Sequence, residues 1–240
     1  MSISSFLEIE PKCHQSNPVN NLRDLSNRLC VQNLKINRGW EVWKKYKSFF
    51  PSSHFVILEN RDTECVTIVT INKYNFLKKV EENIDIFKDV LGAHVTPSII
   101  LDNCLKSSNI FKEVLKNNEV LLGILLGFGR HNAQLFSRKM EIEREINNQK
   151  LSLTNKIPSC GFSTLEEEYR YINEKLTDFN EIGTPDLNPI LMPIPGFAAD
   201  HNHPETQQLK VEYTEQYKKI IKKCQSEKFL ETILRQFCES

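Results

Sequence analysis

Two short stretches carry the residue types best suited to chemistry, and the first places two histidines close to two carboxylates. His201 and His203 alternate in an extended run, so both side chains can face one side, with Asp200 beside them. A zinc site made by Asp200, His201 and His203 is one interpretation, because Zn²⁺ accepts imidazole and carboxylate ligands. We favour helix capping instead, with Pro204 at the first helical position and Glu205 near the positive end of the helix dipole.

The second stretch combines glycines with three consecutive polar residues. Gly123 and Gly127 stand in an apolar helical pattern and are followed by Arg130, His131 and Asn132. A glycine inside a helix costs roughly 1 kcal/mol relative to alanine, so a neighbouring backbone or a ligand should approach closely there. The spacing does not fit a phosphate-binding P-loop. We take these five residues as a candidate ligand-binding or partner-binding site.

Arg130 is the residue on which this second site depends. Side chains on a helix lean toward its N-terminus, so Arg130 should lie over the groove left by Gly127 and Gly123. A buried guanidinium requires an anionic partner. We expect that partner to be a carboxylate of the same chain. An anionic ligand, or a carboxylate of another protein, is the alternative.

A long helix, predicted over residues 119–149, must position these residues. Apolar residues occupy nearly every side of its first half, which is typical of a buried helix. The second half becomes charged from Glu141 onward. The pattern predicts one continuous helix at the centre of the protein, buried where it starts and solvated where it ends.

Upstream, the sequence predicts one β-hairpin and one aromatic helix. Residues 54–59 and 64–72 are rich in β-branched side chains and flank a group of turn residues. Because two strands alone are marginally stable, we expect a third strand from Cys30–Ile36 or Ile190–Ile194. Aromatic residues recur at helical spacing within Arg38–Phe50, and we expect that helix to use them for packing.

Most of the remaining chain has helical periodicity. Gly92 fits the position just after a helix that begins at Lys73, and Thr96 followed by Pro97 fits the start of the next helix. Further predicted helices cover residues 108–116, Ser163 to about Phe179, and Pro204 to near Phe237 with a break near residues 225–226. Residues 180–203 lack helical periodicity but are rich in apolar side chains, which predicts an ordered, extended segment lying across the helices.

Composition indicates a helix-rich globular protein. The chain has 240 residues and only 8 glycines, and scarce glycine disfavours a fold with many strands and tight turns. We predict a mostly α (α+β) fold: a helical bundle around the central long helix, with a small β-hairpin or a two- to three-stranded sheet. Residues 1–20 are expected to form a flexible N-terminus, and residues 21–240 a single α-rich domain.

Charge and cysteine usage narrow the possible functions. Basic and acidic residues are equal, at 31 each. This balance argues against a protein whose main task is to bind nucleic acid or an anionic membrane, although it leaves room for a local basic patch. Seven cysteines without a C-x-x-C pair indicate reduced thiols. We expect neither a cleaved signal nor a membrane span, and therefore a protein that is cytoplasmic or is delivered to a host cell by a signal-less secretion route.

Two stretches carry a family resemblance. They are Glu119–Ala133 with the Leu135-Phe136 pair that follows, and Pro195–Phe197 leading to His203–Thr206. Both resemble uncharacterised proteins of intracellular, chlamydia-like bacteria. The resemblance implies no activity, cofactor or catalytic residue. It implies a bacterial protein and raises the expectation that the protein acts in or on a host cell.

Two functional hypotheses follow from these patterns. The first is a non-enzymatic protein that binds a protein partner through its helical surface, as an effector or an accessory factor, because the sequence contains no recognisable catalytic constellation. The second is a small-molecule or metal-dependent enzyme with its site where the 119–149 helix meets the 180–205 loop. The residues of that site would be Arg130, His131, Asp200, His201 and His203. The first hypothesis requires no cofactor, and the second admits zinc.

Overall fold

A run of β-branched residues makes strand β3, Val66–Asn72, the centre of a three-stranded antiparallel sheet. Strand β2, Phe55–Arg61, pairs with one side of β3 and forms the predicted hairpin. Strand β1, Ile3–Ile9, pairs with the other side. The structure is a computed structural model that describes residues 3–9, 38–49, 52–62, 66–149, 158–159, 161–179, 197–224, 226 and 228.

The third strand comes from neither segment predicted for it. It is β1, Ile3–Ile9, which lies inside the N-terminal stretch of residues 1–20. The two predicted segments, Cys30–Ile36 and Ile190–Ile194, lie outside the described residues. β1 and β3 are far apart in the chain, and pairing over such a separation leaves no mark in local periodicity.

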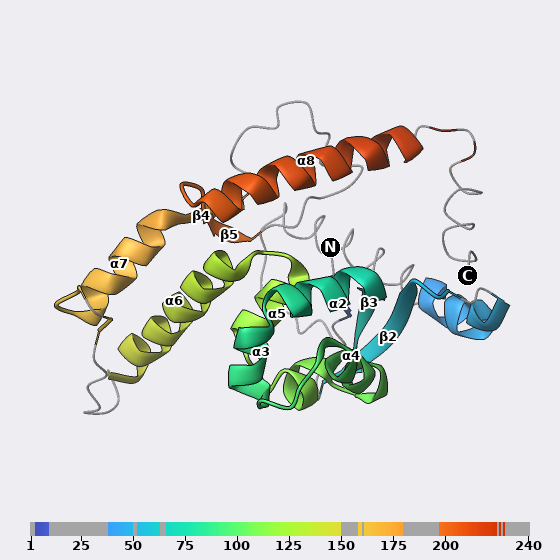
Figure 1. The fold of residues 1–240 in the computed structure, drawn as a ribbon, viewed down its shortest axis with the longest axis horizontal. Coiled ribbons are helices and arrows are strands. Elements are labelled where there is room, and N and C mark those ends of the chain that lie inside the picture. Colours follow the sequence, from blue (N-terminus) through green and yellow to red (C-terminus); the bar gives the residue numbers. More distant parts are fainter. Residues whose placement is uncertain are drawn as a thin grey trace, which may run out of the picture.

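Short helical elements pack beside this sheet (Figure 1). They are α2 (Lys73–Glu82), α3 (Ile84–Leu91), α4 (Pro97–Lys106), the π-helical turn η2 (Ile110–Val114) and α5 (Glu119–Leu126). The predicted end signals are confirmed at Gly92, which has a φ of 109° after α3, and at Thr96, whose hydroxyl accepts the Ile99 N–H at the start of α4. The helix expected to run unbroken from Lys73 is instead interrupted at Asn83, between α2 and α3.

The main hydrophobic core lies between this sheet and α2 to α5. Its members are buried aliphatic and aromatic side chains: Val69, Ile71, Phe76, Val80, Phe87, Ile100, Leu115, Leu121, Ile124 and Leu125. Cys104 of α4 is also buried here, and burial raises the pKa of its thiol to about 12. This cysteine is therefore an inert, protonated core residue.

The long helix predicted over residues 119–149 is two helices. α5 ends at Leu126, and α6 runs from Arg130 to Gln149 in a different direction (Figure 1). Gly127 and Gly129 have φ values of 88° and 87°, which lie in the left-handed region and end a right-handed helix. The periodicity of the apolar residues continues across this break, so it predicted one helix where the glycines make a turn. The prediction of a bundle around one central long helix is therefore wrong in this respect, because two helices, α5 and α6, occupy that segment.

The C-terminal elements form a second layer around α6. α7 (Leu165–Lys175) packs beside α6, and β4 (Leu176–Asp178) pairs with β5 (Ala198–Asp200) just before α8 (Pro204–Cys224). The helix predicted from Ser163 to about Phe179 is shorter in the structure. It runs from Leu165 to Lys175, and the hydroxyl of Thr164 caps its first turn. Pro204 begins α8 as predicted. Residues 180–196 lie outside the described residues.

Residues 38–46 form a helix that continues into the 3-10 turn η1, Lys47–Phe49. This segment stands at one end of the molecule, next to β2 (Figure 1). A helix was predicted here, but its aromatic face is not all used for packing, since Phe49 is 74% exposed.

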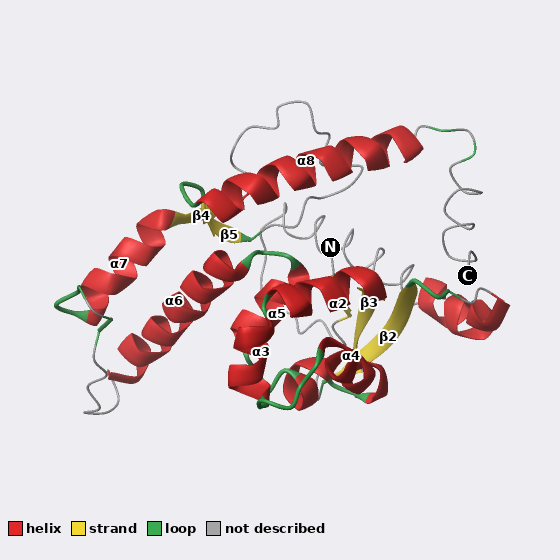
Figure 2. Ribbon diagram, viewed as in Figure 1, coloured by secondary structure: helices red, strands yellow, loops and turns green. Residues whose placement is uncertain are grey.

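Helices dominate the described residues, with two small antiparallel sheets (Figure 2). The predicted mostly α (α+β) class is thus confirmed. Within the described part of the chain, no helix has the length and apolar character needed to cross a membrane.

Candidate functional site

The turn between α5 and α6 is the point at which α8 crosses the chain. The hydroxyl of the buried Tyr213 in α8 donates a hydrogen bond to the Gly127 carbonyl over 3.2 Å. A Cβ atom on Gly127 would lie 2.8 Å from that hydroxyl oxygen, and one on Gly129 would lie 2.9 Å from the Glu205 carboxyl carbon. The two glycines therefore allow α8 to sit directly on the turn.

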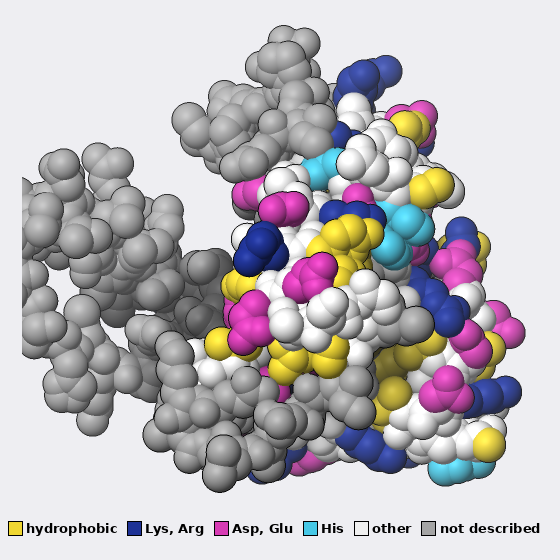
Figure 3. Space-filling model, turned by 90° about the vertical axis from the view of Figure 1, so that its left-hand side faces the viewer, with side chains coloured by type: hydrophobic (Ala, Val, Ile, Leu, Met, Phe, Trp, Pro, Cys, Tyr) yellow, Lys and Arg dark blue, Asp and Glu magenta, His cyan; other side chains and the backbone are white. Residues whose placement is uncertain are grey.

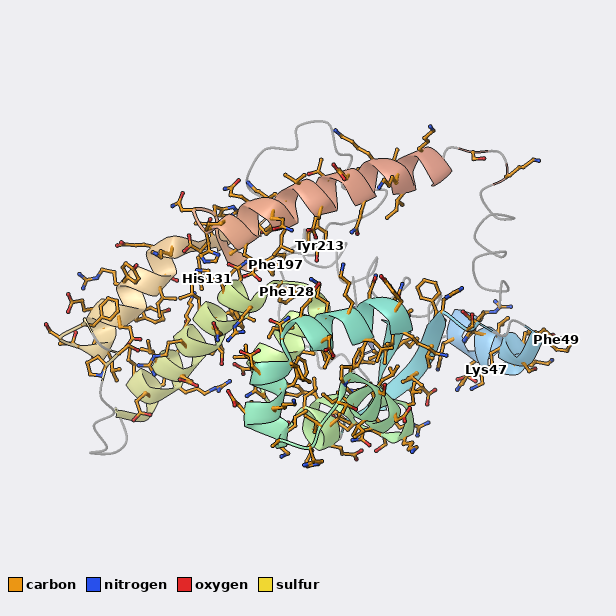
Figure 4. The ribbon with its side chains drawn as sticks, viewed as in Figure 1. Lys47, Phe49, Phe128, His131, Phe197 and Tyr213 are labelled. Carbon is orange, nitrogen blue, oxygen red and sulfur yellow. The ribbon has the colours of Figure 1, made fainter. Side chains whose placement is uncertain are left out.

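Aromatic rings fill the space beneath α8 at this turn. Phe128 stacks on Phe197 with ring centroids 4.4 Å apart, and Phe197 stacks on Phe179, also at 4.4 Å. Tyr213 meets Phe179 edge-on at 5.6 Å. Figure 4 shows Phe128, Phe197 and Tyr213 gathered below the first turns of α8, with His131 beside them. Their packing fixes the position of α8 on α6.

Glu205 caps α6 from the first turn of α8. Its two carboxylate oxygens accept the backbone N–H groups of Arg130 and His131, each over 2.8 Å. These N–H groups lie at the start of α6, where helix geometry leaves them without an intrahelical acceptor. A carboxylate there also interacts favourably with the positive end of the helix dipole. Glu205 was predicted to favour its own helix, and the structure shows that it serves α6.

Asn132 is the most completely bonded polar side chain at this junction. It is buried, and its amide N–H₂ donates to the Phe128 carbonyl at 2.9 Å and to the Thr206 hydroxyl at 3.0 Å. Its amide oxygen accepts the Asp200 N–H at 3.0 Å and the Thr206 hydroxyl at 3.2 Å. One side chain thus connects the α5–α6 turn, β5 and α8.

His131 and His203 stack face to face, with ring centroids 3.6 Å apart and planes 9° from parallel. The Nε2 atom of His131 lies 3.2 Å from a carboxylate oxygen of Asp200, whose side chain is only 4% exposed. Figure 3 shows histidine side chains reaching the surface of this face beside hydrophobic and basic side chains. An imidazole oriented by a buried carboxylate is an arrangement that can transfer protons.

The environment of Asp200 keeps its carboxylate ionised. Burial on its own raises the pKa, but hydrogen bonds from His131 and from the Asn202 N–H, with the charge of Lys175, outweigh it and leave the pKa below its usual value. The Lys175 ammonium lies 3.5 Å from the same oxygen that meets His131. The carboxylate therefore already has several donors within the chain.

His201 does not join this pair of histidines. It is buried against Phe179, and its Nε2 lies 3.2 Å from the Asp178 carbonyl. The three residues of the predicted zinc site, Asp200, His201 and His203, thus point to different neighbours. In the part of the chain that the structure describes, no three His, Cys, Asp or Glu side chains are grouped so that they could hold a metal ion.

Arg130 has an internal carboxylate as its partner, as the sequence led us to expect. Its guanidinium lies 2.8 Å from Asp85 of α3. The pair is on the surface, with side chains 42% and 58% exposed, and not buried in a groove over Gly123. Hydrogen bonding to Arg130 holds the pKa of Asp85 below its usual value.

An apolar groove of about 460 Å³ runs along α5 and α6 on the other side of Asn132. Its lining includes Phe111, Leu122, Leu126, Phe128, Phe136, Met140 and Phe197. Gly123 and Ala133 form part of its floor, where a Cβ atom on Gly123 would lie only 2.8 Å from that of Ala133. The close approach predicted at Gly123 is thus the contact of α5 with α6.

Glu119 contributes the charged group in the lining of this groove. One oxygen of its carboxylate pairs with Arg144 of α6. The other oxygen, Oε2, is buried and accepts no hydrogen bond from any described residue. Because this oxygen is buried, it offers no exposed acceptor to a molecule in the groove, whose lining is mainly apolar.

A second, polar groove of about 480 Å³ separates α2 from α8. Its charged lining is mixed, with Lys78, Lys79 and Arg130 opposed by Glu82, Glu205 and Glu212. Opposite charges at similar numbers give it no preference for an anion or a cation.

Sequence reasoning found the two stretches that meet but missed several residues that join them. Thr206 and Tyr213 follow the predicted helix start, and nothing in their local pattern marks a contact 74 or 86 residues away. Phe136 and Met140 lie in the apolar pattern of the predicted 119–149 helix, and that pattern does not show that they line a groove. Tertiary packing decides whether a residue on an apolar helical row lies in the core or lines a groove, and the local sequence pattern does not record it.

Comparisons of the chain with models of protein families, with curated proteins and with solved structures found no match in any of the three. The functional argument therefore rests on the site itself.

Proposed function

We propose that this protein is a non-enzymatic protein-interaction protein, and that the apolar groove along α5 and α6 is its docking surface. The observation that carries the proposal is Phe136, which is 42% exposed at the edge of a groove lined by further apolar side chains. A partly exposed aromatic side chain beside an apolar groove can serve as an anchoring site for another protein.

The polar residues first considered for chemistry support this choice, because internal bonds occupy them. Asn132 makes its hydrogen bonds to Thr206, Asp200 and the turn, and Arg130 pairs with Asp85. These contacts join α6 to α8 and to α3. Residues that connect helices in this way stabilise the arrangement of the helices that line the groove.

The chemistry of the groove defines the partner. An apolar segment with side chains at helical spacing would bury against the groove wall, as in other helix-in-groove complexes. We therefore propose an amphipathic protein segment that buries its apolar face in the groove, and a role as an accessory protein of the bacterial cytoplasm or as an effector delivered to a host cell.

Site-specific photocrosslinking tests the proposal. A photoreactive phenylalanine analogue replaces Phe136 in the groove, and in a matched control replaces Tyr74, which is 70% exposed on α2. The expected result is one dominant adduct at position 136, on an apolar segment of a protein, and a loss of binding of that purified partner by at least about tenfold in Phe136→Glu. Equal, unselective adducts at both positions would count against the groove as a docking surface.

One observation favours a second candidate function, an enzyme. The contact of His131 with the buried Asp200, beside the stacked His203, places a general base where α6 meets the start of α8. Under this alternative, His131→Gln abolishes turnover in a substrate screen while the groove variant Phe136→Glu retains it. Metal analysis of the folded, purified protein tests the zinc version, which requires bound zinc that His203→Gln removes.

A further inference from the structure

The segment of residues 38–49 exposes an apolar stripe on one side. Val42, Tyr46 and Phe49 follow one another at spacings of four and three residues, and are 52%, 44% and 74% exposed. The rings of Tyr46 and Phe49 lie next to each other, with centroids 6.4 Å apart. Such a stripe on a helix requires an apolar environment that this face does not receive from the described residues.

The opposite side of the segment is attached to the sheet through Glu59 of β2. The Trp40 indole N–H donates to the Glu59 carboxylate at 2.6 Å, and Lys44 lies 3.4 Å from the same oxygen. Hydrogen bonding by Trp40 and Arg61 lowers the pKa of Glu59 to about 2, so this attachment is charged at neutral pH. The helix is therefore held in place by one side while the apolar stripe faces outward.

Basic residues surround the exposed stripe. Residues 38–49 contain four basic side chains, of which Lys44 pairs with Glu41 and with Glu59 on the attached side. Arg38, Lys45 and Lys47 are exposed, and the Lys45 ammonium lies 5.3 Å from the centre of the Tyr46 ring. The chain as a whole has no net charge, so this is a local concentration of positive charge around apolar side chains.

We propose that residues 38–49 are a membrane-surface anchor, which inserts Val42, Tyr46 and Phe49 among the headgroups of an anionic lipid bilayer while the lysines meet lipid phosphate and carboxylate groups. Basic amphipathic helices with aromatic side chains lie in the plane of such an interface. The anchor is peripheral and is separate from the groove along α5 and α6, so it goes beyond the proposed function and can fail independently of it.

The position and shape of the segment favour lipid over protein as its occupant. Figure 4 shows Lys47 and Phe49 at one end of the described residues, in the turn η1 that ends the segment. A convex end with flexible lysines suits a flat, charged surface, whereas an apolar protein partner would gain more from a concave site. Tyrosine and tryptophan are also the side chains that prefer the boundary between headgroups and hydrocarbon.

The chain contains only two tryptophans, Trp40 and Trp43, and both are in this helix. Trp40 lies on the side attached to Glu59, so co-sedimentation and not tryptophan emission is the readout. The full-length protein is mixed with vesicles of phosphatidylcholine alone, or with about one third phosphatidylserine. We expect co-sedimentation with the anionic vesicles only, and a loss of it as the salt concentration rises.

Three variants separate the contributions. Phe49→Ser should weaken partitioning about tenfold, because one buried aromatic ring is lost, whereas Phe49→Leu should retain most of it. Lys45→Glu with Lys47→Glu should weaken it by at least about tenfold, since two favourable charges become unfavourable. Tyr74→Ser, at an exposed aromatic of α2, and Lys88→Glu with Lys112→Glu, at exposed lysines elsewhere, are the matched controls and should bind as the wild type.

Far-UV circular dichroism of each variant establishes that it is folded before lipid is added, and the Phe49→Leu variant provides a second test that depends little on folding. The proposal is overturned if the wild type ignores anionic vesicles at low salt, or if Phe49→Ser binds as well as the wild type. Equal binding by the Lys45→Glu/Lys47→Glu variant also overturns it. A wild type that ignores lipid but cross-links to one protein through position 49 replaces the lipid anchor by a protein-docking surface.

Discussion

The side chains of Asn132 and Thr206 bond to each other twice, although 74 residues separate them in the chain. Asn132 lies in the first turn of α6, and Thr206 lies in the first turn of α8. Both are almost fully buried, at 1% and 0% exposure. Since buried polar groups are costly unless they are bonded, this pair requires α6 and α8 to meet in one register.

Asn132→Ala is therefore expected to destabilise the protein by about 2–4 kcal/mol, because the Thr206 hydroxyl and the Asp200 N–H lose their buried partner. Urea unfolding followed by circular dichroism measures the change. Asn147→Ala, at an exposed position of the same helix, is the control and should change stability by less than about 0.5 kcal/mol. Equal effects at the two positions would mean that the Asn132 network does not hold α8.

Two glycines in different settings, Gly127 in the α5–α6 turn and Gly39 in a helix, give predictions of opposite sign. Gly127→Ala should destabilise by about 1–3 kcal/mol, because the residue has a φ of 88° and its new Cβ atom would meet the Tyr213 hydroxyl at 2.8 Å. Gly39→Ala should stabilise by up to about 1 kcal/mol, since Gly39 lies in a helix with open space around it. Thermal unfolding of the two single variants compares them. A neutral Gly127→Ala would argue against the left-handed turn.

Glu205→Ala removes the carboxylate that caps α6 from α8. The expected cost is about 1–2 kcal/mol, because the N–H groups of Arg130 and His131 lose their acceptor and the helix dipole loses a favourable charge. Hydrogen exchange of those two amides should accelerate more than that of amides in the middle of α6. Glu215→Ala, at an exposed position of α8, should leave the exchange unchanged.

Much of the fold was predictable because its signals are local. The cap at Thr96, the glycine after Leu91 and the proline at the start of α8 each depend on neighbouring residues only, and each was found where it was predicted. The hairpin of β2 and β3 has the same basis. Arg130 pairs with a carboxylate of the same chain, as expected, although the pair is exposed and not buried.

The errors share one physical cause, which is that tertiary contacts decide between equally good local alternatives. Gly127 and Gly129 fit either a helix with a close neighbour or a turn, and the crossing of α8 selects the turn. The choice of Ile3–Ile9 as third strand depends on pairing with β3, which no local pattern records. Asn132 was predicted as a ligand-binding or partner-binding residue, whereas the structure bonds it to Thr206, a residue that no local pattern connects with it.

Acid sensitivity should come largely from Glu168 of α7. Its side chain is 2% exposed and bonds to Arg138 through two contacts of 2.8 Å, and to the hydroxyl and N–H of Ser159 at 2.6 and 2.9 Å. The hydrogen bonds from Arg138 and then Ser159 lower the pKa of Glu168 from 4.5 to about 2. Because the folded pKa lies below the unfolded one, this stabilisation is complete above about pH 4.5 and is lost as the pH falls toward about 2.

Glu168→Gln should therefore cost about 2–3 kcal/mol at pH 7, and the difference from the wild type should shrink progressively below about pH 4.5. Urea unfolding at a series of pH values measures both curves. The variant should keep a weaker acid dependence, because the pKa of Glu59, lowered to about 2 by Trp40 and Arg61, contributes over the same pH range. Glu166→Gln, at an exposed position of the same helix, should follow the wild-type curve. A constant difference between Glu168→Gln and the wild type from pH 7 to pH 3 would show that Arg138 does not depress the pKa of Glu168.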